Sequence, residues 1–183
     1  MTVNKHASKS GPAAVELHLD RLARLYNSLD PSPFREKELD AAVDDYIVGA
    51  AQEIGTRPLR LVIHLPEGEL RQTGADDVIS AIHNHFVWRE QAEQRRLHSE
   101  LRRGRFSLLI GVAFLILCLG LRELIRLPET TAGQMIREGL LIVGWVAMWG
   151  PLDVFLYGWW PIAGRRRLFA RLSKVEIDVR PLR

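Results

Sequence analysis

The stretch Phe106–Leu121, FSLLIGVAFLILCLGL, is an apolar run of sixteen residues without a charged side chain. As a helix it reaches roughly 24 Å at about 1.5 Å per residue, short of a hydrocarbon core of about 30 Å. The helix can continue to Leu127 and end before Pro128, because arginine side chains in the added turn can extend their charged heads to the interface. We therefore predict a first transmembrane helix over 106–127.

A second apolar stretch, Gly139–Gly164, contains a single charged residue, Asp153. It predicts a second transmembrane helix over 136–160, joined to the first by an external loop over 128–135. The alternative is a helical hairpin buried in a soluble protein. The remainder of this 183-residue chain is too small to cover such a hairpin, so we favour the membrane.

Arginines gather beside both apolar stretches. Residues 89–105 carry six arginines against three glutamates, and residues 165–183 carry seven Lys/Arg against two acids, whereas the segment between the apolar stretches is neutral. The positive-inside rule then predicts an inner-membrane protein with both termini in the cytoplasm. The side chains expected at lipid headgroups are Arg103, Arg105, Arg165, Arg166, Arg167 and Arg171, and those expected in an aromatic belt are Tyr157, Trp159 and Trp160.

Composition excludes several other classes. The single cysteine, Cys118, excludes a disulfide scaffold, and 47% hydrophobic residues exclude wholesale disorder. Residues 1–88 carry nine Lys/Arg against thirteen Asp/Glu, so the basic balance of the chain comes from its short flanks. This distribution argues against a nucleic-acid partner, which needs a basic face on a folded module.

The region before the membrane is expected to fold as a cytoplasmic helical and strand domain with a stalk helix over 12–105, after a disordered tail over 1–11. A first helix is predicted from Pro12 to Leu29 and a second over Glu36–Ile54, which Gly55 ends. The first prediction rests on apolar residues at helical spacing: Val15, Leu19, Leu22, Tyr26 and Leu29. A long helix is predicted to begin near Asp76, as its N-cap, and to lead into the first span.

Two segments have the spacing of strands. Residues 59–65 place Leu59, Leu61, Ile63 and Leu65 on one side, and residues 174–180 alternate apolar and polar side chains more cleanly. Because a lone strand leaves its backbone groups unpaired, we expect them to share one sheet, whose direction of pairing the sequence leaves open. Outward Arg60 and His64 would then lie near Glu176 and Asp178. Residues 161–183 form an amphipathic segment and the strand that joins the N-terminal domain. The predicted fold is an α+β membrane protein, a two-helix transmembrane hairpin with a small cytoplasmic domain of helices and a minimal two-stranded sheet.

Few polar residues carry a chemical signature. Asp153 is expected at the third position of a helix restarted at Gly150-Pro151, where structural pairing is favoured over proton or ion handling. His83 and His85 lie two residues apart, on different faces of a helix, and adding His64 would need a particular fold, so packed or solvated histidines are favoured over a metal site. Asp40, Asp44 and Asp45 are read as a solvated helix face. With no phosphate loop or nucleophile elbow, the sequence predicts no catalytic residue, cofactor or metal.

The stretches Leu25–Phe34 (LYNSLDPSPF) and Phe155–Ile162 (FLYGWWPI) resemble uncharacterised bacterial two-pass inner-membrane proteins. The resemblance implies architecture and an inner-membrane address, and it carries no activity or functional residue. The sequence thus predicts a membrane-tethered interaction or regulatory module without catalytic activity, with a protein partner or self-association. Its recognition surface would be the Asp-Pro-Ser-Pro-Phe turn and the acidic second helix. The alternatives are a small oligomeric transport or channel component using Asp153 and, third, an enzyme using His83, His85 and Asp153.

Overall fold

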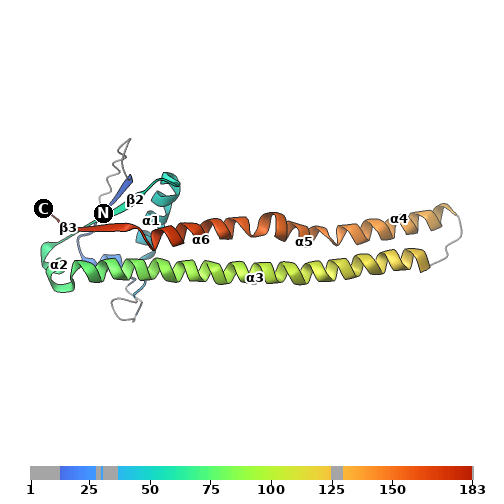
Figure 1. The fold of residues 1–183 in the computed structure, drawn as a ribbon, viewed down its shortest axis with the longest axis horizontal. Helices are drawn as coiled ribbons and strands as arrows, with labels where there is room; N and C mark the ends of the chain where they lie inside the picture. The colour runs from blue at the N-terminus through green and yellow to red at the C-terminus, as the bar shows by residue number, and fades with distance from the viewer. Residues whose placement is uncertain (1–12, 28–29, 31–36, 125–129, 183) are drawn as a thin grey trace. The chain divides into compact units, whose positions relative to one another are not determined.

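A computed structural model describes residues 13–27, 30, 37–124 and 130–182 (Figure 1). The predicted tail over 1–11, most of the Asp-Pro-Ser-Pro-Phe turn and the predicted end of the first span at Leu127 lie outside these residues. The elements in chain order are β1 (Ala13–His18), the 3-10 turn η1 (Leu22–Leu25), α1 (Ala41–Ile54), β2 (Leu59–Leu65), α2 (Glu67–Thr73), α3 (Ala75–Leu124), α4 (Thr131–Val146), α5 (Trp149–Asp153), the π-helical turn η3 (Val154–Gly158), α6 (Trp160–Leu172) and β3 (Glu176–Pro181). They divide into a sheet unit, 1–92 with 165–183, and an apolar unit, 93–164.

The sheet unit contains a parallel sheet of three strands in the order β1-β2-β3. This corrects two predictions: the sheet has one strand more than expected, and residues 13–18 form that strand instead of the first turns of a helix. The buried residues of β1 are Ala13, Val15 and Leu17, alternate positions that a strand places on one face and a helix would not. The predicted pairing of the second and third strands is confirmed, and it is parallel.

One face of the sheet packs against helices α1, α3 and α6. The apolar side chains of β1 and β2 on this face are almost completely buried, and Ile177 and Val179 of β3 pack against them. The helices contribute these residues to the same core: Val43, Ile47 and Ala51 from α1; Val78, Ile82 and Phe86 from α3; and Phe169 and Leu172 from α6.

Helix α1 follows the predicted second helix but begins later, at Ala41. The side chain of Asp40 accepts a hydrogen bond from the amide of Ala42, so Asp40 is the N-cap. Gly55 ends the helix as predicted, with a φ of 69° that favours glycine. Helix α3 begins at Ala75, which places Asp76 in its first turn instead of at the predicted cap, and it continues through Gly104.

In the apolar unit, α4 begins at Thr131, within the segment predicted as an external loop over 128–135. The second apolar segment is interrupted at Ala147–Met148, and α5 restarts at Trp149 instead of at Pro151. Two helical segments of the described chain are long and apolar enough to cross a membrane, Ala75–Leu124 and Thr131–Leu172. Only 17% and 11% of their most apolar stretches are buried, unlike the core helix of a soluble protein.

Candidate functional site

The sheet face opposite the helices is lined mainly by polar and charged side chains. Strand β1 places Glu16 and His18 on it, and β2 places Arg60 and His64 there, since they alternate with buried core residues. Strand β3 adds Glu176, Asp178 and Arg180, which pair in register with Arg60, Val62 and His64. Parallel sheets usually have both faces covered by apolar layers, so a polar face of this kind is unusual.

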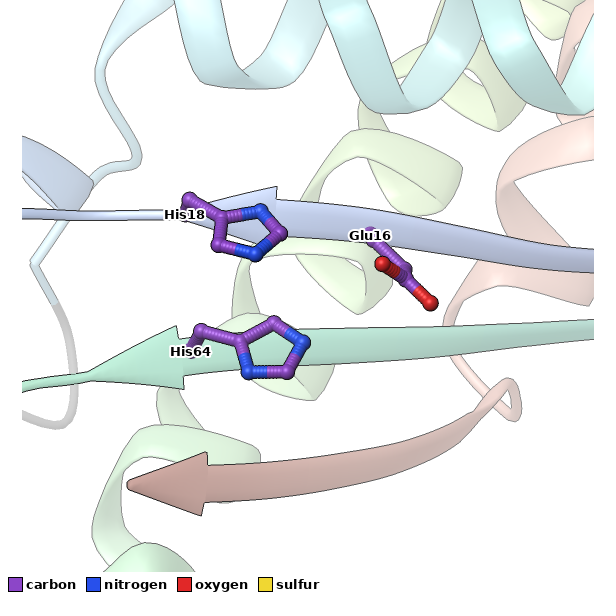
Figure 2. A group of neighbouring side chains, drawn as sticks. All are labelled: Glu16, His18 and His64. Atoms are coloured by element: carbon purple, nitrogen blue, oxygen red, sulfur yellow. The ribbon is translucent and has the colours of Figure 1, made fainter. Parts of the chain in front are cut away.

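Two histidines meet on this face. His18 and His64 are directly opposite each other in the β1–β2 register, and their rings stack with centroids 4.3 Å apart and an interplanar angle of 12°. Glu16 lies two residues before His18, so its carboxylate projects from the same face toward the rings (Figure 2). One ligand atom from each of these three side chains lies within 4.8 Å of the other two.

The surroundings of the histidine pair favour neutral imidazole at His64. Burial lowers the pKa of His64 below its ordinary value, and nearby His18 and Arg180 lower it further, while Glu16 and Asp178 act in the opposite direction. His18 carries a buried Nδ1 atom that has no hydrogen-bond partner among the described residues. Beside the pair is a hollow of about 650 Å³, lined by His18, His64, Arg180, Pro181 and Leu182.

The other charges of the polar face are paired with each other. Arg180 donates to Asp178 from Nε at 2.9 Å and from Nη2 at 2.6 Å, and Arg60 donates to Glu176 at 2.6 Å. The predicted pairing between the two strands is therefore confirmed for Arg60 and Glu176. Asp178 pairs instead within its own strand, and His64 faces Arg180 across the ladder.

A second polar group is buried between helices of the sheet unit. Asp44 of α1, predicted to be solvated, is 4% exposed, and its two carboxylate oxygens contact His85 Nε2 at 3.1 Å and Arg89 Nη1 at 2.8 Å. The amide of Leu39 donates to His85 Nδ1 at 3.3 Å, so the proton lies on Nε2 and is donated to Asp44. Arg89 of this network also lies over the Phe169 ring, with its Cζ atom 4.8 Å from the ring centroid.

The histidines singled out in the sequence are separated. His83 Nε2 lies 2.9 Å from the carbonyl oxygen of Val175, where it joins α3 to the residue before β3. His85 belongs to the Asp44 network, and His64 to the polar sheet face. The structure therefore does not bring His64, His83 and His85 together, and it pairs His64 instead with His18, which the helix predicted over 12–29 had obscured.

The arginines predicted at lipid headgroups differ in their surroundings. Arg103 and Arg105 in the apolar unit are exposed, as are Arg165 and Arg167 in the sheet unit. In the same unit, Arg171 donates to the carbonyl of Gly55, and Arg166 lies 3.9 Å from Glu90.

Asp153 is the last residue of α5, so the prediction that it occupies the third position of a restarted helix is wrong. It is exposed on an apolar wall, at a hollow of about 500 Å³ that is also lined by Trp149, Leu152, Leu156 and Tyr157. Of the predicted aromatic belt, Trp160 and Tyr157 are exposed, while the Trp159 indole donates to the carbonyl of Phe155 at 2.8 Å. The π-helical turn η3 that follows Asp153 carries Tyr157.

No family model, curated protein or solved structure matches this chain. The polar sheet face is therefore defined by the strand register and the side-chain contacts given above. Sequence reasoning missed it because it depends on β1, although one local signal was present: Ala13, Val15 and Leu17 alternate with Glu16 and His18.

Proposed function

We propose that the protein is a non-catalytic module held at the membrane by two transmembrane helices, with the sheet unit in the cytoplasm and its polar face as the recognition surface. The lipid bilayer and a protein partner, or a second copy of the chain, are the expected partners, and no nucleic acid is. The polar face replaces the acidic second helix in this role, because Asp44 of that helix points into the core.

The observation that carries this proposal is the parallel pairing of β2 with β3. β2 precedes both apolar helical segments in the chain, and β3 follows both of them. If these segments cross a bilayer, two strands of one sheet must lie on the same side of it. An even number of crossings meets this requirement.

Orientation is supported by the arginine distribution. The segments that flank the apolar stretches on the side of the sheet unit are rich in arginine, whereas the segment between the stretches is neutral. Positively charged flanks are retained in the cytoplasm, so the sheet unit is expected there, in the inner membrane of a bacterium.

Reporter fusions test this topology. An alkaline phosphatase or a green fluorescent protein is fused after Arg183 in one pair of chains and inserted near Thr131 in another pair. We expect fluorescence without phosphatase activity after Arg183, and phosphatase activity without fluorescence near Thr131. Phosphatase activity at Arg183, or full release of the protein from membranes without detergent, would contradict the proposal.

One observation favours a second function, a small oligomeric transport or channel component. Asp153 is exposed among large apolar side chains, and an ionised carboxylate facing lipid is costly. Packing of several copies around Asp153 would remove it from lipid. Ion flux into liposomes containing the purified protein is then expected, and Asp153→Asn should reduce it; flux that is absent, or unchanged by this substitution, argues against the second function.

A further inference from the structure

We propose that Glu16, His18 and His64 form a binding site for a divalent transition-metal ion of the Zn²⁺ class. All three side chains belong to the sheet unit and project from its polar face (Figure 2). The inference goes beyond the proposed function and does not depend on the membrane topology.

The site is set by the strand register. His18 and His64 are direct partners across the β1–β2 ladder, and Glu16 is the next residue of β1 on the same face. Strand register fixes Cα positions, so these three side chains remain neighbours whenever the sheet is formed. Their ligand atoms lie within 4.8 Å of one another. Tetrahedral zinc, with bonds of about 2.0–2.2 Å, requires ligand atoms about 3.3 Å apart, so the proposed ion would draw the side chains together from the stacked arrangement.

The donor set matches the chemistry of the ion. Two imidazoles and one carboxylate are the protein ligands of several open zinc sites, and they also suit other divalent first-row metals. Three protein ligands leave a fourth position for water or for a group from a partner. The hollow beside His18 and His64 gives solvent and small ligands access to that position.

The local charges also favour a cation. Arg180, which faces His64 across the β2–β3 ladder, is held by two hydrogen bonds to Asp178, and Arg60 is held by Glu176. Glu16 forms no salt bridge with another described residue, so its negative charge remains available. The buried Nδ1 of His18 has no hydrogen-bond partner in the described part of the chain, and an unpaired buried nitrogen is costly.

The experiment uses the full chain, purified in detergent micelles and stripped of metal with EDTA. Calorimetric titration with Zn²⁺ is expected to show one site per chain. Removing a residue that only hydrogen-bonds to a metal ligand weakens metal affinity about 10- to 100-fold. His18→Gln, His64→Gln and Glu16→Gln alter the ligands themselves, so each should weaken Zn²⁺ binding by at least about tenfold. His98→Gln is the matched control, because it removes an exposed histidine of α3 and should leave the affinity unchanged.

A measurement on the unaltered protein covers the case in which a variant fails to fold. Diethylpyrocarbonate modifies neutral imidazoles, and Zn²⁺ should slow the modification of His18 and His64 without slowing that of His98, as followed by mass spectrometry. The proposal is overturned if Zn²⁺ protects neither histidine of the pair. It is also overturned if folded Glu16→Gln binds Zn²⁺ as tightly as the unaltered chain, or if His98→Gln weakens binding as much as the three site substitutions do.

Discussion

The buried carboxylate of Asp44, on α1, contacts two side chains of helix α3. Both oxygens of Asp44 are engaged, by His85 and by Arg89 of α3, and the Arg89 guanidinium lies over the Phe169 ring of α6. Charged groups in a core are tolerated when they are paired and hydrogen-bonded, and removing one partner leaves the others uncompensated. The network therefore connects α1, α3 and α6 in the sheet unit.

Replacing Asp44 by alanine should destabilise the sheet unit by about 2–4 kcal/mol, somewhat below the range for a fully buried pair because Arg89 is partly exposed. Hydrogen exchange of the α1 amides, measured by mass spectrometry on the chain in micelles, reports this loss as faster exchange. Asp45→Ala is the control, because Asp45 is the adjacent exposed residue and its removal should cost no more than about 0.5 kcal/mol. Equal effects of the two substitutions would show that the Asp44 network contributes little.

The sequence was least informative about the surroundings of individual polar residues. The three aspartates at positions 40, 44 and 45 look alike in the sequence, yet one caps a helix, one is buried and one is exposed. The difference arises from contacts with α3, more than forty positions along the chain. His18 and His64 were likewise separate in sequence, since their proximity depends on strand register, which local spacing does not encode.

Among the elements, strands and helices with a clear period were predicted well. Residues 59–65 carry apolar side chains at every second position and form β2, and Gly55 ends α1 where expected. Strand β1 was mistaken for a helix because Val15, Leu19 and Leu22 also fit a helical period. Its alternation covers only six residues, too few for local spacing to separate the two periods.

The two apolar helical segments pack in the apolar unit through glycines. A Cβ added at Gly144 of α4 would lie 2.8 Å from Leu115 Cδ1 and 3.3 Å from Cys118 Cβ, both on α3. One added at Gly111 would lie 3.2 Å from the backbone oxygen of Ala147. Small residues allow helix backbones to approach closely in lipid, where packing replaces the hydrophobic effect as the driving force.

Gly144→Val should therefore separate α4 from α3, at a cost of about 1–3 kcal/mol for overpacking. Cys118 is the single cysteine and is buried, so its labelling by a maleimide in micelles reports the separation directly. We expect labelling to be about 5- to 150-fold faster in this variant, the ratio that corresponds to that cost. Gly120→Val is the matched control, since a Cβ there meets nothing within 4 Å, and its labelling rate should match that of the unaltered chain. Unchanged labelling of Gly144→Val would contradict this packing.

For the whole molecule, the decisive feature is that the chain after the second apolar segment returns to the sheet. The composition predicted two apolar helices with arginine flanks, and the two strands that the sequence showed clearly do pair. The parallel direction was not predictable, because it depends on which strands become neighbours in the sheet, and local spacing does not encode that.

Ile177→Asn tests whether β3 stabilises the sheet, because Ile177 packs against the hydrophobic core on the sheet face that the helices cover. We expect a loss of about 1–2 kcal/mol, less than for a fully buried isoleucine, and faster hydrogen exchange of the β2 amides. The control is Glu176→Gln, the neighbouring residue on the polar face, which loses one surface ion pair worth at most about 1 kcal/mol. If the β2 amides exchange no faster in Ile177→Asn than in Glu176→Gln, β3 does not stabilise the sheet.

The pairing of Arg60 with Glu176 joins residues 116 positions apart. During synthesis on the ribosome, β2 emerges before both apolar helical segments and keeps one edge open until residues 176–181 have been translated. With the topology proposed above, that edge closes only after both apolar helices have entered the bilayer. In a chain whose second helix failed to insert, the β2 edge that normally pairs with β3 would stay accessible to chaperones and proteases. Completion of the sheet would therefore distinguish correctly assembled molecules from those that are degraded.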